Sequence, residues 1–327
     1  MTPQARYGYL GIMWIPAVEL VLAALLPSSA PDLEPGRKLR QEGKIQEAIL
    51  FFQEVLASQP DPLDAERELG HCLVLAGRYA EAVAAYAKLA ASDDPRRQLE
   101  AAKWTGLAHL YLGNIETALK QNRRERHLAE QLGERSAQVR ATWYAGQVHT
   151  ELGQFGAANT AFLAAFDLSP DDLDALHLVG VLTARQGDWG SLRHQVQDLE
   201  LAVARSGDPD PTGRVYHLKA ELALGQGKPQ EAQELLEKTS ITNPLYQETM
   251  ARAYRAQGDL PRAEATYGII LHSTDQRLDA PLYYMKALLG MAEVLDSQER
   301  GEEAASLYRR FLEHWGNAAG PLPGVAA

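Results

Sequence analysis

The sequence predicts an all-α fold, a solenoid of antiparallel helix pairs. A six-residue segment that usually begins with Gly and ends with Ala recurs eight times, at intervals of 31 to 41 residues. A small residue lies seven positions before the start of each segment, and a large apolar residue often lies nine positions after it. Such a period is typical of repeat proteins in which each unit is one supersecondary structure.

Each recurring segment is expected to form the turn between the two helices of one repeat. Its first residue is Gly in seven copies, and Gly at a helix end adopts positive φ at little cost. Leu192 replaces the final Ala in the fifth copy, which is therefore degenerate. The predicted turns are residues 43–48, 77–82, 113–118, 153–158, 187–192, 227–232, 258–263 and 299–304.

Two further sets of residues predict how the helices pack. Small residues on the first helix let the second helix approach closely. Large apolar residues on the second helix are expected to fill the gap to the next repeat. The small residues are Gly36, Gly70, Gly106, Gly146, Gly180, Ala220, Ala251 and Ala292, and the large ones are Phe52, Tyr86, Phe162, Leu236, Tyr267 and Tyr308.

Local signals place several other boundaries. Pro60 and Pro170 end the second helices of the first and fourth copies, because proline cannot continue a helix. Gly133 separates two helices within residues 127–140. The last helix ends near residue 315, and residues 316–327 are expected to form a flexible tail rich in Gly, Pro and Ala.

Residues 1–30 form an apolar N-terminal segment. Residues 7–26 are long enough for one membrane crossing at about 1.5 Å rise per residue. Ser28 and Ala30 resemble a signal-peptidase site, but Glu19 and Pro16 lie inside the apolar run. We expect a signal peptide or a single membrane anchor, with a helix that caps the first repeat as the alternative. This favours an exported or membrane-anchored protein over a cytoplasmic one.

The composition excludes several classes of protein. One cysteine cannot form an intramolecular disulfide or supply a cysteine-based zinc site. The formal net charge of −11 argues against a general nucleic-acid binder, because phosphate neutralisation needs a basic surface. The basic run at residues 123–127 is interrupted by Glu125 and is interpreted as a solvated helix face.

The sequence offers no catalytic motif. It lacks the nucleophile, phosphate-binding and zinc-binding patterns GxSxG, GxGxxG and HExxH. His109 and His149 occupy equivalent positions in two copies and are expected to be at least half-buried between helices. Cys72 is interpreted as a small packing residue. We therefore expect a protein that is not an enzyme and that has no metal and no cofactor.

The turn Gly, the Ala that follows it, the preceding small residue and the later aromatic residue together resemble the tetratricopeptide repeat family. The resemblance covers about residues 31–315 and is best in the first, second and fourth copies. It implies a right-handed superhelix of about eight helical hairpins. The fifth and sixth copies depart from the pattern, since Leu192 replaces Ala and Lys219 stands beside Ala220.

The resemblance also implies a peptide-binding groove along the first helices of the repeats. Trp143 and Tyr144 would provide amphipathic anchors, and arginines would contact carboxylates. The residues carried onto this groove are Arg67, His71, Lys103, Arg140, Trp143, Tyr144, Gln147, His177, Arg185, Arg214, His217, Arg252 and Arg255, with Glu221 beside them. An ordinary solvated helix face without a dedicated ligand is the alternative interpretation.

The expected function is a scaffold or adaptor that binds extended or acidic segments of other proteins and does not bind nucleic acid. Two alternatives remain open at this stage. The chain could be a regulatory module that acts with a separate kinase or transcription factor. It could also be a membrane-tethered factor in envelope assembly if residues 7–26 form an anchor.

Overall fold

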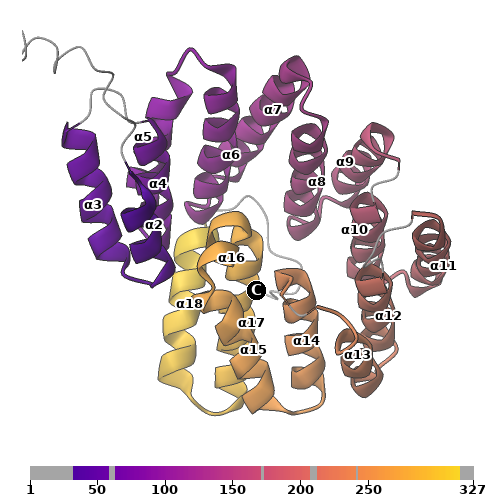
Figure 1. The fold of residues 1–327 in the computed structure, drawn as a ribbon. Coiled ribbons are helices and arrows are strands. Elements are labelled where there is room, and N and C mark those ends of the chain that lie inside the picture. Colours follow the sequence, from indigo (N-terminus) through magenta and orange to yellow (C-terminus); the bar gives the residue numbers. More distant parts are fainter. Residues whose placement is uncertain (1–31, 59–62, 171–172, 207–211, 241, 317–327) are drawn as a thin grey trace, which may run out of the picture. The chain divides into compact units, whose positions relative to one another are not determined.

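The computed structural model describes residues 32–58, 63–170, 173–206, 212–240 and 242–316. The signal peptide or anchor expected within residues 1–30 lies outside these ranges, as does the expected tail from residue 317 onward. The part of the chain that the structure describes contains seventeen helices and no strand. The all-α fold class is therefore confirmed (Figure 1).

The helices have the following bounds. The first nine are α2 (Glu34–Gln41), α3 (Ile45–Ser58), α4 (Leu63–Leu75), α5 (Tyr79–Ala90), α6 (Pro95–Tyr111), α7 (Ile115–Leu132), α8 (Arg135–Glu151), α9 (Phe155–Leu168) and α10 (Leu173–Arg185). The others are α11 (Trp189–Ser206), α12 (Thr212–Gly225), α13 (Pro229–Leu236), α14 (Pro244–Ala256), α15 (Leu260–His272), α16 (Thr274–Asp279), α17 (Pro281–Ser297) and α18 (Gly301–Trp315).

The helices form the eight predicted pairs. Seven pairs follow one another from α2–α3 to α14–α15, and α17–α18 is the eighth. The short helix α16 lies between the last two pairs and has no counterpart in the sequence pattern. Each pair packs on its neighbours, so the structure is a solenoid in which stability comes from contacts within and between adjacent repeats.

Positive φ angles occur at all eight turns. Gly takes this conformation in the first seven, for example with φ 76° at Gly43 and 77° at Gly258. Glu299 occupies the eighth turn with φ 62° and is exposed. Gly133 also has positive φ and separates α7 from α8, as predicted. The left-handed conformation costs a residue with a Cβ atom about 1–2 kcal/mol, which glycine avoids.

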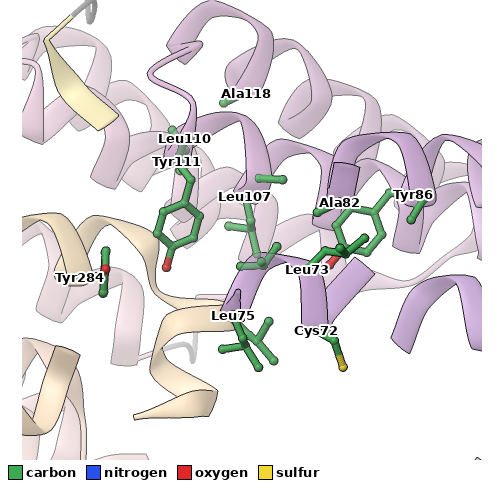
Figure 2. Close-up of a cluster of buried hydrophobic side chains, with 14 of the residues drawn as sticks. Cys72, Leu73, Leu75, Ala82, Tyr86, Leu107, Leu110, Tyr111, Ala118 and Tyr284 are labelled. Atoms are coloured by element: carbon green, nitrogen blue, oxygen red, sulfur yellow. The ribbon is translucent and has the colours of Figure 1, made fainter. Parts of the chain in front are cut away.

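The small residue of a repeat lies beneath an aromatic ring of the same repeat. A Cβ atom added at Gly36 would lie 2.5 Å from the ring of Phe52, and one at Gly146 would lie 2.5 Å from the ring of Phe162. Tyr86 covers Gly70 in the same way and is fully buried (Figure 2). Two of these rings also face the next repeat, as predicted, since Tyr86 stacks near Trp104 of α6 and Phe162 packs with Leu178 of α10. Tyr267 packs on the following repeat too, against Gly290.

The last repeats contact the first ones. Helix α16 packs on α4, and both α17 and α18 pack on α6 (Figure 1). The Arg277 guanidinium donates to the Leu75 carbonyl oxygen at 2.6 Å, and His314 Nδ1 donates to the Tyr111 carbonyl oxygen at 2.7 Å. Tyr284 of α17 lies 5.5 Å from Tyr111, centroid to centroid, within the buried cluster in Figure 2. The array therefore closes on itself through side chains far apart in the sequence.

The contact between small residue and ring predicts opposite effects for two matched substitutions. Gly146→Ala should lower the free energy of unfolding by about 1–3 kcal/mol, because the new methyl group overlaps the Phe162 ring. Gly106→Ala should be neutral or stabilising by up to about 1 kcal/mol, because the nearest atom is 3.4 Å away and Ala favours the helix. Urea unfolding of both variants tests this, and equal effects would contradict it.

The eighth turn allows a test of backbone strain. Glu299→Gly should raise the free energy of unfolding by about 1 kcal/mol, because it removes the Cβ atom from a residue with φ 62°. Gly258→Ala is the matched control and should lower the same quantity by about as much. Thermal unfolding followed by circular dichroism measures both, and a destabilised Glu299→Gly variant would contradict the interpretation.

Candidate interaction surface

The residues predicted to form the groove come from the first helices of the second to seventh repeats. Nine of these residues line three neighbouring pockets. The first pocket includes Lys103, Arg140, Trp143 and Tyr144, the second includes Trp143, Tyr144, Gln147 and His177, and the third includes Arg185, Arg252 and Arg255. Trp143 and Tyr144 line both of the first two pockets, and Leu282 lines both of the last two. Adjacent pockets therefore share walls.

The first pocket, called here the α6–α8 pocket, has a volume of roughly 270 Å³. Its walls come from α6, α7 and α8, and Asp279 closes one side from the end of α16. Most of the lining is apolar. The lining residues are Ala102, Lys103, Gly106, Leu107, Leu110, Ala118, Leu119, Asn122, Glu125, Arg140, Trp143, Tyr144, Val148 and Asp279.

The charged groups of the α6–α8 pocket are paired with one another. Arg140 Nη2 donates to Glu125 Oε1 at 2.7 Å, and Lys103 Nζ donates to Asp279 Oδ1 at 2.9 Å. Glu125 is 4% exposed, and burial raises the pKa of its carboxyl group despite the Arg140 charge. Arg140 Nε and the Tyr144 hydroxyl are buried without a hydrogen-bond partner among the described residues. Since these two atoms are themselves buried, the accessible wall of the pocket is mainly apolar.

The second and third pockets continue the surface toward the last repeats. The second has a volume of roughly 210 Å³ and lies between Trp143, Tyr144 and the first residues of α14 and α17. The third, roughly 240 Å³, brings the side chains of Arg185 and Arg252 opposite Lys286 and Trp315. Because α17 and α18 supply part of this lining, the last repeats form one wall of the surface that the sequence predicts as a groove.

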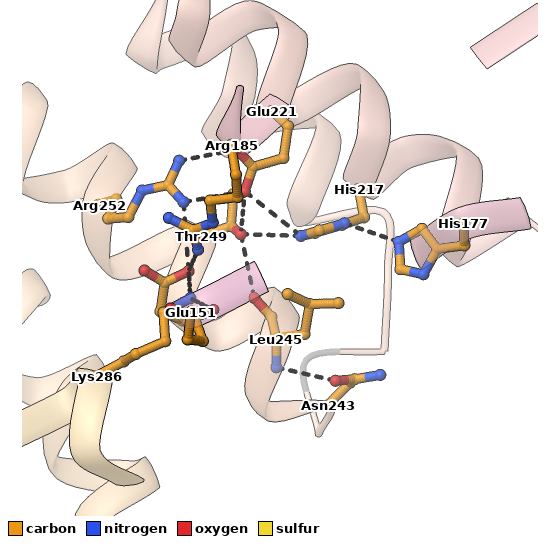
Figure 3. Close-up of polar contacts among 11 residues, drawn as sticks. Glu151, His177, Arg185, His217, Glu221, Asn243, Leu245, Thr249, Arg252 and Lys286 are labelled. Atoms are coloured by element: carbon orange, nitrogen blue, oxygen red, sulfur yellow. Dashed lines mark hydrogen bonds and ion pairs between the residues drawn. The ribbon is translucent and has the colours of Figure 1, made fainter. Parts of the chain in front are cut away.

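A buried polar network lies behind the third pocket (Figure 3). Arg252 Nη2 donates to Glu221 Oε2 at 2.8 Å, and Arg185 Nη2 donates to Glu248 Oε2 at 3.0 Å. Burial alone would raise the pKa of Glu248, but the charges of Lys286, Arg252 and Arg185 outweigh it and lower the pKa to about 2. Both carboxylates are therefore ionised, and α10, α12, α14 and α17 are linked through them.

Two histidines extend this network. The Glu221 carboxylate only accepts, so the Thr249 hydroxyl donates to it at 2.7 Å. His217 Nε2 then donates to Thr249 at 2.9 Å, and His177 Nε2 donates to His217 Nδ1 at 2.9 Å (Figure 3). Burial lowers the pKa of His217 to about 4, against the opposing effect of Glu221, and it lowers the pKa of His177 as well. Both rings are neutral members of the core.

The other predicted residues are also engaged within the chain. Arg67 pairs with Glu100 at 3.0 Å, and Arg214 pairs with Asp174 at 2.6 Å. Arg255 forms an ion pair with Glu293. His71 is 6% exposed and its ring lies 4.3 Å from that of Trp104, centroid to centroid. All seven predicted cations are thus paired with carboxylates, and the three predicted histidines are buried.

Among the lining residues of the α6–α8 pocket that are absent from the predicted groove are two polar residues of α7, Asn122 and Glu125. Glu125 is read from the sequence only as an interruption of a basic run, yet it is buried while Arg123, Arg124 and Arg126 beside it are exposed. Asn122 stands nine residues after the third turn, where five of the other copies carry a ring. This missing ring is the signal in the sequence that could have identified the pocket.

The structure gives no support for chemistry at the single cysteine. Cys72 is buried, and burial raises the pKa of its thiol to about 12, which keeps it protonated. Within the described ranges, three or more His, Cys, Asp or Glu side chains nowhere gather as a metal site would require. Among the same residues, no helix combines the length and the apolar character that spanning a membrane requires.

The buried histidines predict a pH dependence of stability. Because the folded-state pKa of His217 lies below its ordinary value of 6.5, the unfolded chain takes up its proton first as the pH falls. The free energy of unfolding is therefore unaffected by protonation of His217 above about pH 6.5 and falls as the pH decreases toward 4. At pH 5 the loss is on the order of 2 kcal/mol. His217→Asn should reduce the difference between urea unfolding at pH 7 and at pH 5. His272→Gln changes an exposed histidine and is the control, so it should leave that difference unchanged. Equal differences in the wild-type protein and both variants would contradict the role of His217.

Comparison with known proteins agrees with this fold. Models of the tetratricopeptide repeat match residues 39–103, 217–267 and 248–321, which together make up more than half of the chain. A tetratricopeptide repeat protein from Parabacteroides merdae ATCC 43184 has a similar structure, with a TM-score of 0.51 and 15% identity, over 79% of this chain and 97% of that one. A Rap protein complexed with competence and sporulation factor has a TM-score of 0.47 and 11% identity, over 93% of this chain and 99% of the other. No curated protein sequence matches the chain. The chain belongs to the tetratricopeptide repeat family.

Proposed function

We propose that this protein is a non-catalytic scaffold that binds an extended segment of another protein along the three pockets. The observation that carries the proposal is that adjacent pockets share walls, with Trp143, Tyr144 and Leu282 as common lining residues. Proteins of this repeat family are generally interaction modules. A row of adjacent pockets can bind an extended ligand peptide that crosses several repeats and places one side chain in each pocket.

The pairing of charges argues for a non-catalytic role of this surface. Catalysis by carboxylates or histidines needs groups that are free to exchange protons at an accessible site. Glu221 and Glu248 are instead held ionised by arginines, and His177 and His217 are buried and hydrogen-bonded. These groups hold helices together, which leaves shape and apolar contact for recognition.

The same pairing bears on which partner is bound. The sequence suggests acidic segments as ligands because the predicted groove is rich in arginine. In the structure each of those arginines already has a carboxylate partner, for example Arg140 with Glu125 and Arg185 with Glu248. An acidic ligand would have to compete with these carboxylates. We therefore propose a predominantly uncharged extended segment as the ligand.

Removal of two side chains at the junction of the pockets should weaken binding. Peptides selected from a random phage-displayed library against the full chain serve as probes. Trp143→Ala combined with Gln147→Ala should lower their affinity at least tenfold, because aromatic anchors in pockets contribute about 2 kcal/mol or more. Fluorescence polarisation measures the affinity, and circular dichroism checks the fold.

The matched control is a second double variant on an exposed face outside the pockets. Arg193→Ala with Leu201→Ala changes two exposed residues of α11 and should leave the affinity unchanged. Failure to select any peptide against the wild-type chain would contradict the proposal. So would an equal loss of affinity in both double variants.

A further inference from the structure

The third repeat lacks the ring that covers the small residue in the first, second and fourth repeats. Phe52, Tyr86 and Phe162 each lie nine residues after a turn and pack over the glycine of their own repeat. The corresponding residue of the third repeat is Asn122, and its glycine is Gly106. No ring covers Gly106; the nearest atoms to a Cβ placed there belong to α7, at 3.4 Å and beyond. The third repeat therefore differs from the first, second and fourth at this ring position.

The missing ring coincides with the α6–α8 pocket. Both Gly106 and Asn122 line it, together with Ala118 at the end of the turn segment. An apolar cavity of about 150 Å³ is known to bind benzene, so a volume of roughly 270 Å³ accommodates an aromatic side chain and the peptide group attached to it. The pocket thus has the size and the wall chemistry for a ring supplied from outside the repeat.

The charges of the pocket select an uncharged occupant. The two cations, Lys103 and Arg140, are each paired with one of the two carboxylates, Asp279 and Glu125. The lining therefore sums to zero formal charge, and an ion entering it would lose its hydration without gaining a free counter-charge. A neutral aromatic group loses little on entering and removes apolar wall from water.

We propose that the α6–α8 pocket binds the uncharged aromatic side chain of a partner's extended segment, which takes the place that an intrachain ring holds in the neighbouring repeats. This inference rests on the proposed function, because it names the residue class that the scaffold recognises. The third repeat is then the specificity-determining repeat of the array. Its recognition element is the absence of a side chain at position 122 large enough to fill the pocket.

The test restores the missing ring. Asn122→Phe should fill the pocket and lower the affinity for library-selected peptides at least tenfold, while the thermal unfolding midpoint stays equal or rises. Asn159→Phe is the matched control, since it places the same ring on the exposed face of α9 and should leave the affinity unchanged. Replacing the aromatic residue of the peptide with Ala should cause a similar loss with the wild-type chain, which needs no protein variant.

The outcomes separate this inference from the proposed function. Selected peptides that share no aromatic residue, or that bind Asn122→Phe as tightly as the wild-type chain, would overturn the pocket assignment and leave the scaffold proposal standing. Absence of any selected peptide would contradict both. Light scattering tests whether a second copy of the chain occupies the pocket. If the wild-type chain binds no peptide but self-associates, and Asn122→Phe abolishes the self-association, the occupant is a second copy and the inference is overturned.

Discussion

The close approach of the two helices in each repeat is the contact on which the rest of the structure depends. A glycine on the first helix gives room for a buried ring from the second, as at Gly36, Gly70 and Gly146. A Cβ atom at these positions would overlap the ring, so the pair of residues fixes the separation of the helices. The third repeat obeys the same geometry without the ring, and its pocket is the consequence.

Closure of the array adds a second constraint. Tyr111 and His314 are 203 positions apart and meet through a hydrogen bond, and Arg277 reaches the carbonyl oxygen of Leu75. These contacts place α16 and α17 beside the first helices of earlier repeats, where they supply Asp279 and Leu282 to the pockets. The interaction surface is therefore a product of two distant parts of the chain, although the repeat pattern alone assigns it to one helix of each repeat.

The sequence predicts what depends on local contacts and misses what depends on distant ones. Turn glycines, small residues and their rings recur at fixed spacing, so the eight helix pairs and the burial of Cys72 follow from the pattern. Family resemblance assigns Trp143 and Tyr144 to a groove, and in the structure both residues line a pocket. The partners of the arginines cannot be read in this way, because Glu125 and Glu248 lie on helices whose relation to Arg140 and Arg185 depends on the superhelix. The role of Asn122 is visible only as a missing ring, which a search for present motifs overlooks.

The magnitudes of the interactions decide between charge and shape as the basis of recognition. Separating Arg252 from Glu221, whose side chain is 4% exposed, leaves a buried carboxylate without its counter-charge and costs about 3–5 kcal/mol. A new ion pair with a solvated ligand returns only about 0–1 kcal/mol. Burial of one aromatic side chain contributes about 1.5–3 kcal/mol and breaks no existing pair. A neutral aromatic segment therefore gains free energy on this surface where an acidic one loses it, even though the surface is lined with arginine.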